Sequence, residues 1–167
     1  MRASIIFAFL LVFAFGWAAS SVLNPMFMLD TEQPFSFSWS FDKAAERASP
    51  SNHIEQDSIH VYHDRIVLDI KDAIFAKYAD TNSMDPLLDK DANGIEIKPS
   101  SPVQIKVGDV ISYKSTLTKS LLVHRVVSRG YDDNGHYFIT KGDNNPSVDP
   151  EKIRFSQVHG LLIGVIY

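Results

Sequence analysis

The sequence predicts a mostly β domain that follows a single membrane-spanning helix at the N-terminus. Three observations predict this organisation. The chain starts with an uncharged apolar run, it carries a series of short β-rich runs after residue 57, and an Asn-Gly turn signal separates two of those runs. At 167 residues the chain can hold one domain with an appendage.

The apolar run covers residues 3–23 and contains no charged side chain. About 20 apolar residues span a bilayer as a helix. Arg2 is the only charge before the run, and no basic residue follows it until Lys43. The positive-inside rule then places the N-terminus in the cytoplasm and the remainder of the chain outside. We therefore predict a single-pass membrane protein with an anchor over residues 1–23.

A cleaved signal peptide is the alternative interpretation of the same run. Gly16, Ala18 and Ala19 are small residues of the kind that mark a cleavage point. The apolar core of a cleaved signal peptide usually extends over only about 7–15 residues. The greater length of this run favours a retained anchor.

Residues 24–56 are expected to form a tether, because they contain Pro25, Pro34 and Pro50 without a sustained helical or strand period. Aromatic and serine side chains alternate strictly between Phe35 and Phe41. That alternation is typical of a half-buried strand at a domain edge. An aromatic surface at the lipid headgroups is the second interpretation, and the sequence leaves both open.

Residues 57–167 are expected to form the β-rich domain. The segment from Asp132 to Gly135 is a strong hairpin signal, because Asn-Gly suits a turn that needs positive φ. Many short strands with close turn signals indicate a β-barrel or a β-sandwich. The expected strands cover residues 59–62, 65–70, 73–79, 107–114, 121–128, 136–140 and 160–167.

Composition excludes several classes of function. The net charge of −4 argues against nucleic acid as a partner, because phosphate binding needs a basic surface. The absence of cysteine excludes disulfides, a thiol nucleophile and thiolate metal sites. The spacing of His60 and His63 suggests a metal site, but in a strand the two side chains would point to opposite faces and could not bind one ion together. The residues from Asp89 onward weakly resemble a calcium-binding loop. A calcium loop needs a carboxylate at its twelfth position, and Ser100 stands there instead. We therefore predict no metal and no cofactor.

Three clusters carry side chains suited to acyl transfer by serine. They cover residues 81–86 (Thr-Asn-Ser-Met-Asp-Pro), 123–127 (Val-His-Arg-Val-Val) and 140–145 (Thr-Lys-Gly-Asp-Asn-Asn), and Asp149 follows the last. A serine hydroxyl needs a base to remove its proton. Histidine suits that task near neutral pH, and a carboxylate can orient its ring.

These clusters, together with Gly108-Asp109-Val110 and in this order, resemble the type I signal peptidases over residues 76–167. The His-Arg-Val-Val form looks like the archaeal and endoplasmic-reticulum branch, whereas a lysine base stands at that place in the common bacterial branch. The resemblance implies a signal-peptidase-like β domain. It also implies an extracytoplasmic serine endopeptidase whose substrates are the signal peptides of exported preproteins. Such an enzyme would work in contact with the lipid of the membrane.

The resemblance also implies a role for each matched residue. Ser83 matches the nucleophile and His124 the general base. Asp149 is the first choice for the orienting carboxylate and Asp143 the second. Thr81 and the backbone N–H of Ser83 match the oxyanion donors. Lys141 is rejected as a base of the Ser–Lys type, because His124 occupies the position of that lysine.

Two rival functions remain open at this point. One is a self-cleaving peptidase of the repressor type, which would be cytoplasmic, use a lysine base and carry a DNA-binding domain. The other is a non-catalytic, membrane-anchored binding module of the same fold. The residues before the β region match no family motif, so partner subunits in the membrane are a further expectation.

Overall fold

The computed structural model describes residues 48–167. The predicted anchor over residues 1–23 and most of the predicted tether lie outside this range. Among the described residues, no helix is long and apolar enough to cross a bilayer. The elements in chain order are η1 (Gln56–Ser58), β1 (Ile59–Val61), β2 (Ile66–Leu68), β3 (Ala73–Lys77), β4 (Asn93–Ile97), β5 (Val110–Lys114), β6 (Leu121–Asp132), β7 (Gly135–Lys141), β8 (Ile153–Arg154), η2 (Phe155–Gln157) and β9 (Val158–Ile166).

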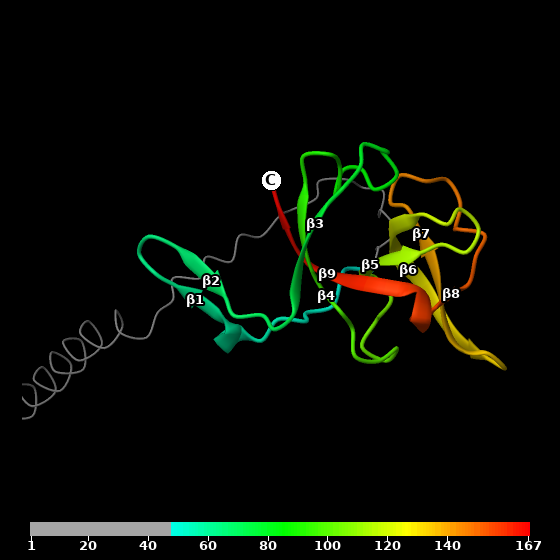
Figure 1. The fold of residues 1–167 in the computed structure, drawn as a ribbon, viewed down its shortest axis with the longest axis horizontal. Coiled ribbons are helices and arrows are strands. Elements are labelled where there is room, and N and C mark those ends of the chain that lie inside the picture. The colour runs from blue at the N-terminus through cyan, green and yellow to red at the C-terminus, as the bar shows by residue number, and fades with distance from the viewer. Residues whose placement is uncertain (1–47) are drawn as a thin grey trace, which may run out of the picture. The chain divides into compact units, whose positions relative to one another are not determined.

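Seven of the strands form one antiparallel sheet in the order β3-β4-β9-β5-β6-β7-β8 (Figure 1). The predicted mostly β fold class is therefore confirmed. The edge strands β3 and β8 do not pair with one another in the described part of the chain, so backbone hydrogen bonds do not close the sheet. The long strand β9 joins the β3–β4 pair to the strands β5 to β8. It pairs with β5 through its first half and with β4 through its second.

The middle of the sheet is buried on both faces. Side chains of neighbouring residues in a strand point to opposite faces, and neighbours on β5 and β9 enter different apolar clusters. Ile111 and Leu161 pack into one cluster, and Val110 and Leu162 pack into the other. This double burial explains why apolar residues stand next to one another in these strands, as in Val110-Ile111 and Leu161-Leu162, instead of alternating with polar ones.

The hairpin predicted from the Asn-Gly signal is present. Asp132 pairs with Gly135 at the end of β6 and β7, and Gly135 has a φ of 92°. Two strands were not predicted, β4 and β8. Strand β4 begins with Asn93-Gly94, which has the composition of a turn, and only its place between β3 and β9 makes this segment extended.

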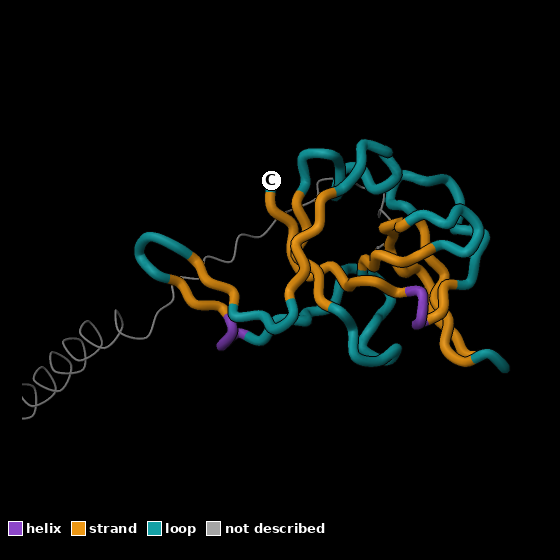
Figure 2. The backbone as a smooth tube through the Cα atoms, viewed as in Figure 1, coloured by secondary structure: helices purple, strands orange, loops and turns teal. Residues whose placement is uncertain are grey.

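Strands β1 and β2 form a separate hairpin that stands apart from the seven-stranded sheet (Figures 1 and 2). The pairs Ile59–Leu68 and Val61–Ile66 place four aliphatic side chains on one face of the hairpin. Ile66 is 67% exposed. His60 and His63 are also exposed.

The end of the predicted tether contacts the β domain. The backbone N–H of Ser51 donates to Oδ1 of Asp109 at 2.7 Å, and Nε2 of His53 lies 2.9 Å from Oδ2 of the same carboxylate. Asp109 is fully buried. These contacts show that the chain joins the domain before the boundary expected at residue 57.

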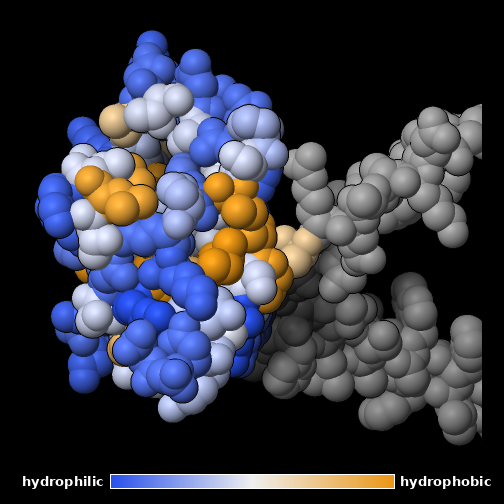
Figure 3. All heavy atoms as spheres, turned by 90° about the vertical axis from the view of Figure 1, so that its right-hand side faces the viewer, coloured by the Kyte–Doolittle hydropathy of each residue, from blue (hydrophilic) through white to orange (hydrophobic). Residues whose placement is uncertain are grey.

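The surface toward the β6–β8 end of the sheet is mostly hydrophilic, with separated apolar areas (Figure 3).

Candidate active site

Ser83 lies in a turn that follows β3, and the loop after β7 holds that turn in place. The preceding residue, Asn82, has a φ of 54°, a left-handed conformation that asparagine adopts more readily than most residues. The backbone N–H of Asn144 donates to the carbonyl of Ser83 at 3.0 Å. The Asn144 side chain donates to the carbonyl of Asn82 at 3.0 Å. Gly142 permits this approach, because a Cβ there would lie 2.5 Å from the Ser83 carbonyl oxygen.

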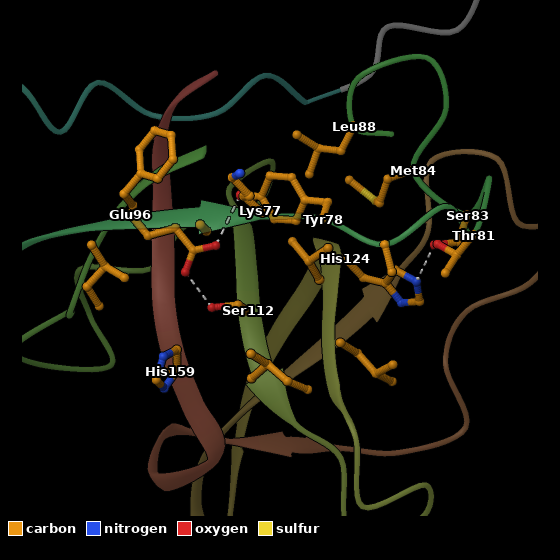
Figure 4. A pocket seen from close by; sticks show the side chains of 17 residues that line it. Lys77, Tyr78, Thr81, Ser83, Met84, Leu88, Glu96, Ser112, His124 and His159 are labelled. Atoms are coloured by element: carbon orange, nitrogen blue, oxygen red, sulfur yellow. Dashed lines mark hydrogen bonds between the residues drawn. The ribbon is translucent and has the colours of Figure 1, made fainter. Parts of the chain in front are cut away.

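His124 lies on β6 and faces the turn that carries Ser83 (Figure 4). Its Nε2 is 3.3 Å from Oγ of Ser83, and its Nδ1 is 2.7 Å from Oδ2 of Asp149. The ring of Tyr113 contacts the imidazole edge-to-face, with 6.4 Å between the ring centroids. His124 is 7% exposed, so its orientation is fixed by packing as well as by hydrogen bonds.

Asp149 is anchored by two hydroxyl groups in addition to the imidazole. Tyr113 donates to Oδ2 at 2.9 Å, and Thr140 donates to the same oxygen at 2.6 Å. Burial alone would raise the pKa of Asp149, but the hydrogen bonds from His124, Thr140 and Tyr113 outweigh it and hold the pKa below its ordinary value. The carboxylate therefore stays ionised beside His124 at neutral pH.

Asp143 has a different partner. Its two oxygens accept from Nε and Nη2 of Arg125 at 2.7 and 2.6 Å. Nη1 of Arg125 donates to the carbonyl of Gly108 at 2.7 Å. Arg125 follows His124 directly on β6, so this bidentate pair fixes the strand that carries the imidazole. Of the two aspartates proposed for the orienting role, Asp149 contacts His124 and Asp143 does not.

Thr81 lies beside the nucleophile candidate, with its Oγ1 3.3 Å from Oγ of Ser83. It is exposed, and it enters the same cavity as Ser83. A hydroxyl in this position can turn its proton toward an oxygen that bears negative charge next to Ser83. Met84, the residue after the nucleophile candidate, is 2% exposed and packs in the apolar cluster that contains Leu88 and Val110.

A cavity of about 390 Å³ opens in front of Ser83 and His124. One wall is formed by the consecutive residues 74–79, which include the end of β3. The opposite wall is formed by residues 121–124 at the start of β6. Apolar side chains of Met84 and Leu88 line its interior.

Both walls of the cavity carry sheet edges that are open in the described part of the chain. Strand β3 pairs with β4 alone. On β6, residues 121–124 pair with β5, and pairing with β7 starts only at Arg125. An extended peptide that enters the cavity therefore meets unpaired backbone groups on two sides, which is the geometry of strand addition.

Sequence reasoning missed several groups that support the site. The Tyr113 and Thr140 hydroxyls that hold Asp149 lie on separate strands, 36 and 9 residues away from it in sequence. His53, which had no pattern around it, pairs with Asp109. A hydroxyl in a strand carries no sequence signal of its own, so only the three-dimensional contacts identify these groups.

Comparisons with known proteins give little further information. No protein-family model matches the chain. An uncharacterized protein of Methanocaldococcus jannaschii is 43% identical over 44 residues, which is 26% of this chain. The match spans 22% of the length of that relative. The relative's description assigns it no activity.

Proposed function

We propose that this chain is a membrane-anchored serine endopeptidase that removes signal peptides from exported preproteins, a peptidase of the type I signal peptidase kind. The observation that carries the proposal is the hydrogen-bonded series Ser83–His124–Asp149, with distances of 3.3 and 2.7 Å, at the mouth of a cavity. The motif order in the sequence supports the same assignment. The predicted anchor would keep the domain at the extracytoplasmic membrane surface.

The chemical roles follow from the contacts. His124 removes the proton from Oγ of Ser83, which attacks the scissile carbonyl carbon. Asp149 stabilises the imidazolium that forms. The negative charge on the carbonyl oxygen is bound by the Thr81 hydroxyl and the backbone N–H of Ser83. The C–N bond then breaks, and the leaving amine takes the proton from His124. Water repeats the sequence on the acyl ester, with His124 again the base, and regenerates Ser83.

The cavity walls support an extended peptide as substrate. The region before a signal-peptide cleavage site would lie as an added strand between β3 and the start of β6, where backbone groups are unpaired. Side chains next to the cut would then point into the cavity, where Met84 and Leu88 offer an apolar lining. Shallow pockets that select small side chains are what the family resemblance implies.

The test is cleavage of a preprotein by the full chain in membranes. The variants are Ser83→Ala and His124→Ala, and the matched controls are Ser128→Ala and His60→Ala at exposed positions outside the cavity. We expect cleavage at the signal-peptide site by the wild type and both controls, and its loss in both site variants. Cleavage that survives Ser83→Ala contradicts the mechanism. No cleavage by the wild type, with or without added membrane extract, favours the non-catalytic binding module.

A further inference from the structure

A buried carboxylate lies below the substrate cavity, and the acyl-transfer mechanism does not use it. Glu96 on β4 is 1% exposed. Its Oε1 accepts from the Tyr78 hydroxyl at 3.1 Å, and its Oε2 accepts from the Ser112 hydroxyl at 2.6 Å. No lysine, arginine or histidine of the described residues forms an ion pair with it. A buried carboxylate needs hydrogen-bond donors, so Glu96 depends on the hydroxyls of Tyr78 and Ser112 in these positions.

The backbone around this cluster leaves space for it. A Cβ at Gly94 would overlap the Tyr78 hydroxyl, and a Cβ at Gly160 would overlap Oε2 of Glu96. Both glycines are buried in strands, where a glycine otherwise weakens the strand. Close approach of side chains is a recognised reason for glycine in a strand. The sequence therefore accommodates Tyr78 and Glu96 in these particular positions.

The cluster borders the same cavity as the candidate nucleophile. Tyr78, Glu96 and Ser112 line the cavity together with Ser83 and His124. Figure 4 shows the Tyr78 ring between Glu96 and Met84 in that view. The ring packs against the apolar cluster that contains Met84. Burial and the neighbouring Glu96 raise the pKa of Tyr78 far above its ordinary range, so its hydroxyl remains a donor.

We propose that Tyr78 is a specificity-determining residue whose ring, held in place by Glu96 and Ser112, limits the size of the substrate side chain that the cavity accepts. The inference rests on the proposed peptidase function. A large side chain would have to displace the ring and break its bond to Glu96. That would leave a buried acceptor short of a donor, which is costly. Tyr78 is then the wall, and Glu96 and Ser112 are positioning residues that keep it rigid.

The experiment measures kcat/KM for preproteins that differ only in the residue on the amino side of the cut: Ala, Val, Leu or Phe. The full chain in membranes is compared with Tyr78→Ala and with Tyr131→Ala, a tyrosine that is 73% exposed and outside the cavity lining. We expect the wild type and Tyr131→Ala to prefer Ala. We expect Tyr78→Ala to raise the Leu-to-Ala ratio of kcat/KM by about tenfold or more, the scale on which apolar pockets discriminate size.

Variants of the positioning residues separate this role from a merely structural one. Glu96→Ala should shift the ratio in the same direction as Tyr78→Ala, and Glu96→Gln should restore part of the preference because its amide can still bond both hydroxyls. Gly94→Ala should also raise the ratio, since the added methyl displaces the Tyr78 hydroxyl. Should Tyr78→Ala lose its cooperative melting transition, Tyr78→Leu carries the same test with a shorter apolar side chain.

The outcomes distinguish the inference from the function on which it rests. Cleavage by a folded Tyr78→Ala or Tyr78→Leu variant with an unchanged ratio overturns the inference and leaves the peptidase function intact. A ratio that also shifts in Tyr131→Ala overturns it as well, because the effect is then not local. Absence of cleavage of every substrate by the wild type overturns the proposed function and the inference together.

Discussion

Oδ2 of Asp149 lies 2.7 Å from Nδ1 of His124, and the hydroxyls of Tyr113 and Thr140 donate to that same oxygen. One carboxylate oxygen thus gathers three partners from three different strands. Asp143, six residues earlier, gives both of its oxygens to Arg125. The two aspartates should therefore respond differently to the same substitution.

Asp149→Asn should reduce kcat by about 10⁴-fold, the loss seen when the orienting carboxylate of a Ser-His-Asp triad becomes an amide. The amide keeps the shape of the side chain but cannot stabilise an imidazolium. Asp143→Asn is the matched control, and it should keep far more activity because Asp143 does not touch His124. Single-turnover cleavage measures the effect. Equal losses in the two variants would contradict the assignment of Asp149.

Thr81→Val should lower kcat by about 10²- to 10³-fold with little change in KM, because an oxyanion donor acts mainly in the transition state. Thr81→Ser keeps the hydroxyl and should retain most of the activity. Because Thr81 is exposed, neither substitution should change the melting temperature appreciably. A rise in KM at constant kcat would show instead that Thr81 only binds substrate.

Thr140→Val should raise the pKa of Asp149. Burial raises the pKa of Asp149, and hydrogen bonds from His124, Thr140 and Tyr113 lower it below its ordinary value. Removing the Thr140 donor takes away part of that lowering, so the carboxylate becomes protonated at a higher pH than in the wild type. An NMR titration of the labelled aspartate carboxyl groups in the solubilised chain tests this. The exposed Thr118→Val serves as control, and coincident titration curves for Asp149 would refute the role of Thr140.

The site residues and their order along the chain could be predicted from the sequence, but the hydrogen bonds between them could not. Ser83, His124 and Asp149 belong to short motifs whose spacing is visible in the chain. The choice between Asp143 and Asp149 depends on distances, and both lie in a loop composition that suits turns. The structure distinguishes them because the Thr140 carbonyl accepts from the backbone N–H of Asp149 at 2.8 Å, which turns that residue back toward β7.

The fold shows the same division between local and long-range information. The β6–β7 hairpin was predictable because Asn134-Gly135 fixes a turn within four residues. Strand β4 was not, because its Asn93-Gly94 start has the same local signal and only pairing with β3 and β9 makes it extended. Tertiary context overrides local preference at such a position.

The Arg125–Asp143 pair should contribute more to stability than to chemistry. Each side chain is 17% exposed, so removing one partner leaves a largely desolvated charge. Arg125→Met should therefore lower the free energy of unfolding by about 3 kcal/mol, the lower end for a broken buried pair. Arg125→Met with Asp143→Leu should recover part of that loss, because both charges are then removed. Urea unfolding of the detergent-solubilised chain measures both. A double variant less stable than the single one would contradict this account.

Glu151 links the turn after β5 to the segment that follows Asp149. Its carboxylate accepts from the Ser115 hydroxyl at 2.8 Å, the Thr116 backbone N–H at 2.8 Å and the Gln157 amide at 2.8 Å. Burial acts to raise the pKa of Glu151, but hydrogen bonds from Thr116, Ser115 and Gln157 prevail and lower the pKa from 4.5 to about 2.

A lowered native pKa means that the ionised form stabilises the fold, so this contribution is complete above the unfolded-state pKa of 4.5 and disappears as the pH falls toward about 2. Glu151→Gln should therefore have a lower melting temperature than the wild type at pH 7, and the difference should shrink between pH 4.5 and 2. Thermal unfolding across that range, with the exposed Glu55→Gln as control, checks it. A difference that stays constant with pH would show that Glu151 acts through its shape and not through its charge.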